Sequence, residues 1–329
     1  MGRYRKILVA VDGSQSSRNA LTQAFRFAVD EKCWITVTSV VPPYEGEIET
    51  LGINDIRAAL RKPCDDALGL AQKLAETERA LIKTVCEEGE IYERIVDLAD
   101  AENCDLIIMG RRGQRRSTLV GSVTARVIGH TQREVLVVPD GSPVGWKRIV
   151  FATDGSKYSA AAAERAIAFA QSYGGKLKVI SVVDVPSEFY AEAPQAVEDL
   201  VRKAKGFVAD VKKQAEAAGV PAETFVGESE AYQAINRLAQ EQKADIIILG
   251  SHGRTGLHRL LMGSVTENVI GHATCPVLVV KTLGCPVAAL NDSNALHGFL
   301  VRAFVVFQLT AICTSGYNPG TRRRNAKEE

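Results

Sequence analysis

The stretch RIVFATDGS at residues 148–156 is a short apolar run that ends in Asp-Gly-Ser, and the stretch KILVAVDGS at residues 6–14 resembles it. A short apolar run that leads through a turn into a helical pattern is typical of a buried strand followed by a helix. The two stretches begin 142 positions apart, at residues 6 and 148. The chain therefore repeats a unit that starts with a strand, a turn and a helix.

Four further segments recur in the same order. They are a second apolar run that ends in Gly, a Gly-Ser-Val-Thr turn, a Gly-His pair and a Val-Leu-Val-Val run. The matching residues are 104–110 with 244–250, 121–124 with 263–266, 129–130 with 271–272, and 135–138 with 277–280. The offset is 140 for the first pair and 142 for the others, which indicates a tandem duplication. We expect domains at residues 1–143 and 144–283, followed by a C-terminal extension at 284–329.

The second copy alternates strand patterns with helix patterns. The expected strands are 148–153, 177–185, 222–226, 245–249 and 276–281, and the expected helices are 159–173, 194–218, 232–243 and 264–273. Strands that are apolar on both faces are typical of a parallel sheet covered by helices on both sides. The sequence therefore predicts an α/β fold, with the first strand at the sheet centre because it is the most continuously apolar. Ligands bind such sheets at the carboxyl ends of the strands.

The composition excludes several classes of protein. Hydrophobic residues make up 46% of the chain and charged residues 24%, and the net charge is +1. This balance argues against a dedicated nucleic-acid binder, although four arginines crowd one loop, at positions 111, 112, 115 and 116. The apolar segment 299–313 is shorter than the roughly 20 residues that span a bilayer, so we expect no membrane anchor. With no signal-peptide pattern at the N-terminus, we expect a cytoplasmic protein.

The seven cysteines form no C-x-x-C pair, and their number is odd. This pattern favours a reducing compartment and buried thiols over a disulfide framework or a zinc site. No cluster of His, Cys, Asp or Glu has metal-ligand spacing, so we expect no metal site in the protein itself.

Two loops of the second copy follow strands at their carboxyl ends. The first contains Asp154, Gly155 and Ser156, for which two readings stay open: a turn that caps a helix, or a carboxylate that meets a ribose hydroxyl or a metal near phosphate. The second runs from Gly250 to Ser264 and leads into a helix. Its glycines let the backbone approach a ligand, and a helix N-terminus offers unpaired N–H groups to phosphate.

The spacing of this second loop resembles a known signature. Gly, two residues, Gly, nine residues and Gly-Ser is the ATP-binding pattern of the universal stress protein family, and Gly250, Gly253, Gly263 and Ser264 match it. The resemblance covers both copies, at about residues 3–140 and 147–282. It implies two tandem flavodoxin-like, doubly wound, five-stranded parallel sheets with strand order 3-2-1-4-5.

The resemblance also implies a nucleotide site in the second copy. Asp154, with the preceding strand end, would lie near the ribose and phosphates, and the backbone near Val182 would contact adenine. The glycines and the Gly-Ser-Val turn would wrap the phosphates, with His252 and Arg254 as neighbours. The implied cofactor-binding residues are Ala152, Thr153, Asp154, Val182, Gly250, His252, Gly253, Arg254, Gly263, Ser264 and Val265.

The first copy departs from this pattern. Seven residues, not nine, separate Gly113 from Gly121, and arginines add positive charge there. Two interpretations stay open: a site for a different anion, or a solvated loop in a copy that has lost binding. The corresponding residues are Asp12, Val40, Gly110, Gly113, Gly121 and Ser122.

The sequence contains no P-loop, no dinucleotide G-x-G-x-x-G pattern and no G-x-S-x-G elbow. With no general base in evidence, we expect no catalytic residues and no enzyme. The leading hypothesis is a stress-response protein that binds ATP, with or without Mg²⁺, mainly in its second domain, as a regulatory switch. The alternatives are a nucleotide-free interaction module of the same family and a slow ATPase. We expect a homodimer or an intrachain pseudo-dimer, and a protein partner that the sequence does not identify.

Overall fold

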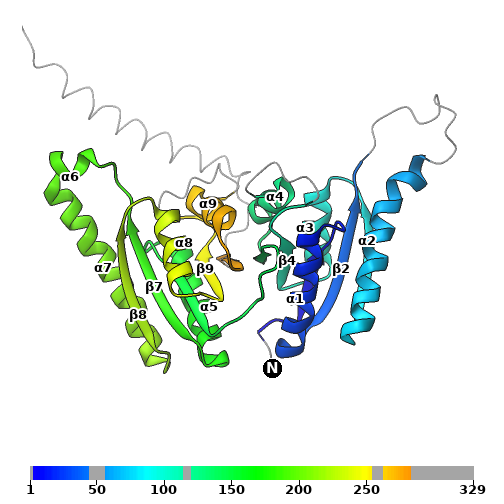
Figure 1. Ribbon diagram of the computed structural model, residues 1–329, viewed down its shortest axis with the longest axis horizontal. Helices are drawn as coiled ribbons and strands as arrows, with labels where there is room; N and C mark the ends of the chain where they lie inside the picture. The colour runs from blue at the N-terminus through cyan, green and yellow to red at the C-terminus, as the bar shows by residue number, and fades with distance from the viewer. Residues whose placement is uncertain (1–2, 44–55, 114–119, 254–261, 283–329) are drawn as a thin grey trace, which may run out of the picture. The chain divides into compact units, whose positions relative to one another are not determined.

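The computed structural model describes residues 3–43, 56–113, 120–253 and 262–282 (Figure 1). Both copies belong to one compact unit, Met1–Leu283. We call residues 3–139 the first half and residues 145–282 the second half. The expected extension, residues 284–329, lies outside the described residues.

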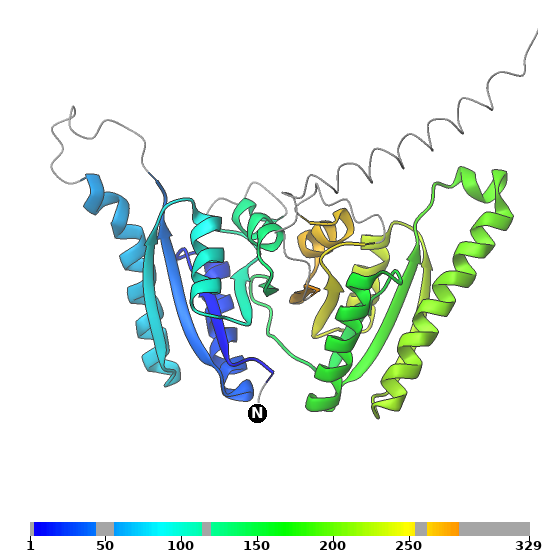
Figure 2. The same cartoon turned by 180° about the vertical axis from the view of Figure 1, so that it is seen from behind.

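The two halves contain matching elements in the same order (Figures 1 and 2). The first half contains β1 (Lys6–Ala10), α1 (Gln15–Glu31), β2 (Trp34–Val41), α2 (Ile56–Glu78), β3 (Ile82–Glu88), α3 (Ile91–Ala101), β4 (Leu106–Gly110), α4 (Ser122–His130) and β5 (Glu134–Val138). The second half contains β6 (Arg148–Ala152), α5 (Lys157–Tyr173), β7 (Lys176–Val183), α6 (Glu188–Glu192), α7 (Pro194–Ala217), β8 (Ala222–Glu228), α8 (Ala231–Glu241), β9 (Ile246–Gly250), α9 (Ser264–His272) and β10 (Val277–Val280). The short helix α6 is the one element here that the apolar spacing did not predict.

The strands form one sheet with the order β3-β2-β1-β4-β5-β10-β9-β6-β7-β8. Within each half the order is 3-2-1-4-5 in that half's own numbering, and the pairs are parallel. The predicted fold class and strand order are confirmed, and the first strand of each half lies at its centre. The two five-stranded sheets are continuous, however, because β5 and β10 pair with each other.

This seam between the halves is antiparallel. Leu278 pairs with Leu136 at its centre, and both are fully buried. The sequence places the same Val-Leu-Val-Val run on both strands, so each strand presents apolar side chains to both faces. The two copies thus pair within one chain through their last strands.

Helices cover both faces of the sheet, and each face has its own core. Ile7 and Val9 of β1 pack into a cluster with residues of α1, α2, α5 and α7, whereas Leu8 packs with α3, α4, α8 and α9. Because side chains alternate along a strand, a continuously apolar strand such as β1 contributes side chains to both cores. Both clusters contain residues of both halves.

An aromatic and polar cluster joins the halves on the α1 and α5 face. Trp146, near the start of the second half, stacks on Phe169, with ring centroids 3.8 Å apart and planes within 6°, and its ring lies 5.6 Å from that of Phe27 in the first half. Glu31 accepts hydrogen bonds from Tyr173 Oη at 2.8 Å and from Arg3 Nη1 at 3.0 Å. Burial raises the pKa of Glu31, but these hydrogen bonds outweigh it, so the pKa lies below its ordinary value. Tyr173 of the second half and Arg3 of the first half together hold the Glu31 carboxylate ionised.

Among the described residues, no helix combines the length and the apolar character needed to cross a membrane.

Candidate functional site

The Asp-Gly-Ser turn of the second half is a helix cap. Ser156 is the N-cap of α5, and its hydroxyl accepts a hydrogen bond from the Ser159 N–H at 3.2 Å. One carboxylate oxygen of Asp154 accepts a hydrogen bond from the Ser156 N–H at 3.0 Å. Gly155 has a φ of +75°, a conformation that other residues adopt only with strain. The capping interpretation of these residues is therefore confirmed. The hydrogen bond from the Ser156 N–H uses the Oδ1 atom of Asp154.

The second carboxylate oxygen of Asp154 faces the Gly loop. A Cβ atom built on Gly253 would lie 2.8 Å from Asp154 Oδ2. A Cβ on Gly250 would lie 2.9 Å from the carbonyl carbon and oxygen of Tyr158 in α5. These approaches explain why glycine occupies both positions. The two loops that the sequence singled out thus meet at the carboxyl ends of β6 and β9.

The far end of the Gly loop leads into helix α9. Gly263 is the N-cap of α9, and it makes no side-chain capping hydrogen bond. The Gly263 N–H instead donates to the Ser251 carbonyl at 3.0 Å, and Thr266 Oγ1 donates to the Gly250 carbonyl at 2.9 Å. These bonds hold the helix start over the end of β9. Ser264 and Val265 are exposed there, so first-turn N–H groups lie at the surface, where they suit an anion.

The remaining predicted residues lie around this point or outside the described residues. Ala152 ends β6, and the Thr153 hydroxyl donates to Ser159 Oγ at 3.1 Å, which gives Thr153 a structural role. Val182 lies near the end of β7, beside β6. His252 is half-buried and contacts Ser251 Oγ at 3.1 Å. Arg254 lies outside the described residues.

The first half repeats the described part of this geometry. Asp12 Oδ1 accepts from the Ser14 N–H at 3.0 Å, and a Cβ on Gly113 would lie 2.6 Å from Asp12 Oδ2. Gly110 packs against Ser16 as Gly250 packs against Tyr158. Two further features match the second half: the start of α4 and the end of β2.

At that helix start, Gly121 is the N-cap of α4, again without a side-chain capping bond, and its N–H donates to the Arg111 carbonyl at 2.9 Å. Ser122 is exposed, and Val40 lies near the end of β2 as Val182 does in β7. The difference in loop length falls within residues 114–119 and 254–261, outside the described residues.

Two cations cross the seam and bind the C-terminal ends of the matching helices. Arg111 Nη1 donates to the carbonyl oxygens of Gly271, at 3.3 Å, and Ala273, at 2.7 Å, at the end of α9. Lys281 Nζ donates to the Ile128 carbonyl in the last turn of α4. Cations are favourable at helix C-termini because the last carbonyls carry negative partial charge. Arg111, the first arginine of the basic loop, thus contacts the C-terminal end of α9 in the other half.

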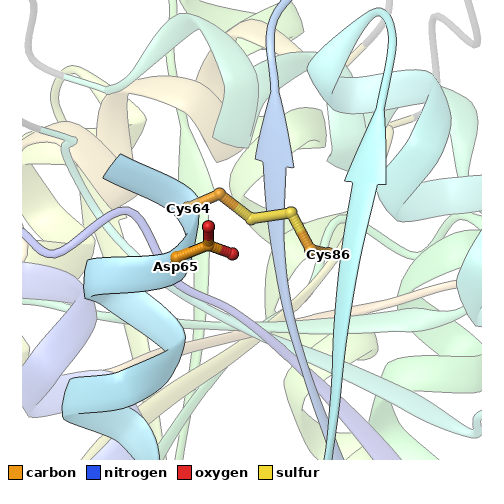
Figure 3. A group of neighbouring side chains, drawn as sticks. All are labelled: Cys64, Asp65 and Cys86. Atoms are coloured by element: carbon orange, nitrogen blue, oxygen red, sulfur yellow. A yellow bond between two sulfur atoms is a disulfide. The ribbon is translucent and has the colours of Figure 1, made fainter. Parts of the chain in front are cut away.

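The cysteine prediction was partly wrong. Cys104 and Cys275 are buried free thiols, and Cys33 is a half-buried one, but Cys64 and Cys86 form a disulfide between α2 and β3 (Figure 3). Packing of a helix over a strand brings together residues 22 positions apart, which spacing rules for motifs do not reveal. Among the described residues, the one His/Cys/Asp/Glu group compact enough for a metal is this pair with Asp65, and its sulfurs are bonded to each other.

Sequence reasoning missed three residues that shape the sites. Tyr158 supplies the backbone against Gly250, and its ring lies 5.4 Å from that of His252. Thr266, and Thr124 in the first half, fasten the helix start to the end of the preceding strand. The repeated Gly-Ser-Val-Thr segment contains both threonines, so recurrence was an available signal for them.

The fold and these loops define a class: tandem doubly wound α/β proteins with a glycine-lined, anion-compatible edge in each half. The model of the universal stress protein family matches residues 3–139 and 145–281. The chain belongs to the universal stress protein family.

Individual relatives agree with this assignment. A universal stress protein of Methanocaldococcus jannaschii is 43% identical over 141 residues, which cover 41% of this chain and 82% of the relative. A putative universal stress protein of Staphylococcus aureus is 33% identical over 149 residues, 44% of this chain and 89% of the relative. The crystal structure of a universal stress protein from Archaeoglobus fulgidus covers 84% of this chain and 96% of its own, with a TM-score of 0.64 and 21% identity. That last likeness bears on the fold alone.

Proposed function

We propose that this chain is a cytoplasmic stress-response protein that binds ATP in its second half and acts as a regulatory switch. The observation that carries the proposal is the approach of Gly253 to Asp154 Oδ2, with 2.8 Å between that oxygen and a Cβ built on the glycine. This approach places a carboxylate beside a glycine-containing loop, at the sheet edge where doubly wound proteins bind ligands.

Each group has a chemical task in this proposal. The first-turn N–H groups of α9, at Ser264 and Val265, bind phosphate oxygens, because the helix N-terminus carries positive partial charge. Asp154 accepts a hydrogen bond from a ribose hydroxyl or helps to hold Mg²⁺ near the phosphates. The backbone near Val182 contacts adenine.

The preference for the second half rests on loop length. The described parts of the two sites match. The basis for preferring the second half is therefore the loop length, which is nine residues between Gly253 and Gly263 and seven between Gly113 and Gly121. We propose that the longer loop encloses a triphosphate and the shorter one does not. Residues 1–143 and 144–283 are then a degenerate domain and a binding domain. A bound nucleotide shifts the population of partner-binding states only if it binds one state more tightly.

The test is isothermal titration calorimetry with ATP on the wild type and on two matched variants. Gly253→Ala introduces a Cβ that displaces a flexible carboxylate, so we expect a folded protein whose ATP affinity is at least about tenfold weaker, or about 1.4 kcal/mol. Gly113→Ala makes the same change in the first half and should leave ATP affinity unchanged. If Gly113→Ala weakens binding and Gly253→Ala does not, the site is in the other half. A wild type that neither binds ATP nor releases a nucleotide on denaturation refutes the proposal.

Two alternatives have distinct readouts. A nucleotide-free interaction module shows no increase in melting temperature with ATP, whereas a ligand at about 100 times its Kd stabilises the folded state by about 2.7 kcal/mol. A slow ATPase releases phosphate in a manner that Asp154→Ala abolishes. Phosphate assays on the wild type and this variant separate turnover from binding.

A further inference from the structure

The disulfide of the first half joins a buried helix position to an edge strand. Cys64 lies in α2 and is 2% exposed, and Cys86 lies in β3 and is partly buried. Their Cα atoms are 6.4 Å apart, within the range that a disulfide spans without backbone movement. Cys64 Sγ is also 3.5 Å from the Ser39 carbonyl oxygen of β2, so the bridge passes over β2 on its way to β3 (Figure 3).

The second half shows that the fold does not need sulfur at these positions. Val226 pairs with Ser181 as Cys86 pairs with Ser39, and Ala204 holds the place of Cys64 on the matching helix. Ala204 is 3% exposed, so a small apolar side chain fills the position in α7. The cysteine pair is therefore an addition to one half of a duplicated framework and not a requirement of its packing.

The local structure around Cys64 also differs from that of α7. Pro63 lies inside α2 directly before Cys64, and a proline within a helix removes one backbone hydrogen bond. At the other end of the bridge, β3 is the edge strand of the described sheet and pairs there with β2. The disulfide therefore links the turn of α2 that contains Pro63 to the edge strand β3.

The other described cysteines are poor competitors for oxidants. Burial raises the pKa of Cys33 to about 12, of Cys104 to about 11 and of Cys275 to about 12. These thiols stay protonated at neutral pH, and the thiolate is the reactive form.

We propose that Cys64 and Cys86 are a reversible thiol-oxidation site, at which a disulfide oxidant such as oxidised glutathione closes a clamp between α2 and β3. Cys86 is the more exposed of the two residues, so its thiolate attacks glutathione disulfide, forms a mixed disulfide and releases one glutathione. The Cys64 thiolate then attacks Cys86 Sγ and releases the second glutathione. The two thiols lose two protons and two electrons, and one glutathione disulfide becomes two glutathione thiols.

The first experiment measures each cysteine in the full chain. The protein is equilibrated with reduced and oxidised glutathione at ratios that span several orders of magnitude, and thiols are counted by differential alkylation and peptide mass spectrometry. We expect Cys64 and Cys86 to convert together within this range, while Cys33, Cys104 and Cys275 stay reduced. Two results overturn the proposal: thiols at Cys64 and Cys86 at every ratio, or a bond between them that no ratio opens.

The second experiment uses the residues of the second half as a matched control. The variant Cys64→Ala/Cys86→Val reproduces the pair Ala204 and Val226. Closing a loop of this length should raise the melting temperature of the oxidised wild type by about 5 to 10 °C over the reduced wild type. The variant should melt near the reduced wild type under both conditions. An equal redox-dependent shift in the variant would assign the effect to other cysteines and refute the clamp; the alkylation experiment needs no variant and so does not depend on its folding.

Discussion

The two halves of the molecule share their sheet order, their strand-end turns and their helix starts, but they differ at the positions around these features. Asp12 and Asp154 accept the same backbone hydrogen bond at the same distance, 3.0 Å. His130 and His272 each contact a carbonyl one turn earlier at 2.8 Å and lie beside Tyr92 and Tyr232. A duplicated scaffold thus keeps the residues that build the fold in both copies.

The halves differ at several individual positions. Cys64 and Cys86 replace an alanine and a valine, Lys32 ends α1 where Gly174 ends α5, and Arg111 stands where the second half has Ser251. The halves therefore have the same architecture, but they differ in the disulfide, in the residues that end α1 and α5, and in the contacts that cross the seam. Four changes test this division.

The largest effect is expected at the seam. Leu136→Ala and Leu278→Ala each remove a fully buried side chain from the central pair of β5 and β10, and each should lower the free energy of unfolding by about 3 kcal/mol. Urea denaturation measures both. The exposed Val29, truncated to alanine, should change stability by less than about 0.5 kcal/mol. A large loss for only one of the two leucines would show that the halves do not share the seam equally.

The next effect tests the arginine that crosses the seam. Arg111→Met removes the hydrogen bonds to the Gly271 and Ala273 carbonyls and should cost about 2 kcal/mol, with faster hydrogen exchange in α9. Arg111→Lys retains the charge and should lose less. Unchanged exchange in α9 together with unchanged stability would mean that these contacts do not hold the helix.

Lys281 gives the seam a pH dependence. Burial lowers the pKa of Lys281 from 10.5 to about 8. Between pH 8 and 10.5 the unfolded chain binds more protons than the folded chain, so the free energy of unfolding should rise with pH, by up to about 3 kcal/mol relative to Lys281→Met. Below pH 8 the difference between the two proteins should be constant. Urea denaturation of both at several pH values measures it, and parallel profiles from pH 8 to 10.5 would contradict the prediction.

The smallest effect is expected from exchanging the helix ends. Lys32 and Gly174 both adopt the left-handed conformation, with φ of 56° and 59°. Because a side chain is strained there, Lys32→Gly should stabilise the protein by about 0.5 kcal/mol, and Gly174→Lys should destabilise it by about 1 kcal/mol. Thermal denaturation measures both shifts. Destabilisation by Lys32→Gly would indicate that the lysine side chain makes a contact worth more than the backbone strain.

Much of the fold could be predicted because its signals are local and occur twice. The apolar runs of β6 and β9, the Asp-Gly-Ser turn and the Gly174 stop predicted element order and most boundaries to within a few residues. The five-residue helix α6 was missed because its sequence has no apolar periodicity, and none of its residues is buried. The meeting of Gly253 with Asp154 was predictable only through the rule that strand carboxyl ends share an edge.

By itself, the sequence determined the duplication, the doubly wound α/β class and the positions of the two candidate loops, because strand burial, turns and helix caps act over a few neighbouring residues. The tertiary structure alone decided that β5 and β10 make one continuous sheet, that Arg111 reaches α9, and that Cys64 meets Cys86. These contacts join residues that lie far apart in the chain, and their distances depend on how helices and strands pack. Beyond the length of the Gly loop, the halves differ in three contacts that the other half does not repeat: the Cys64–Cys86 disulfide, the contact of Arg111 with α9 and the contact of Lys281 with α4.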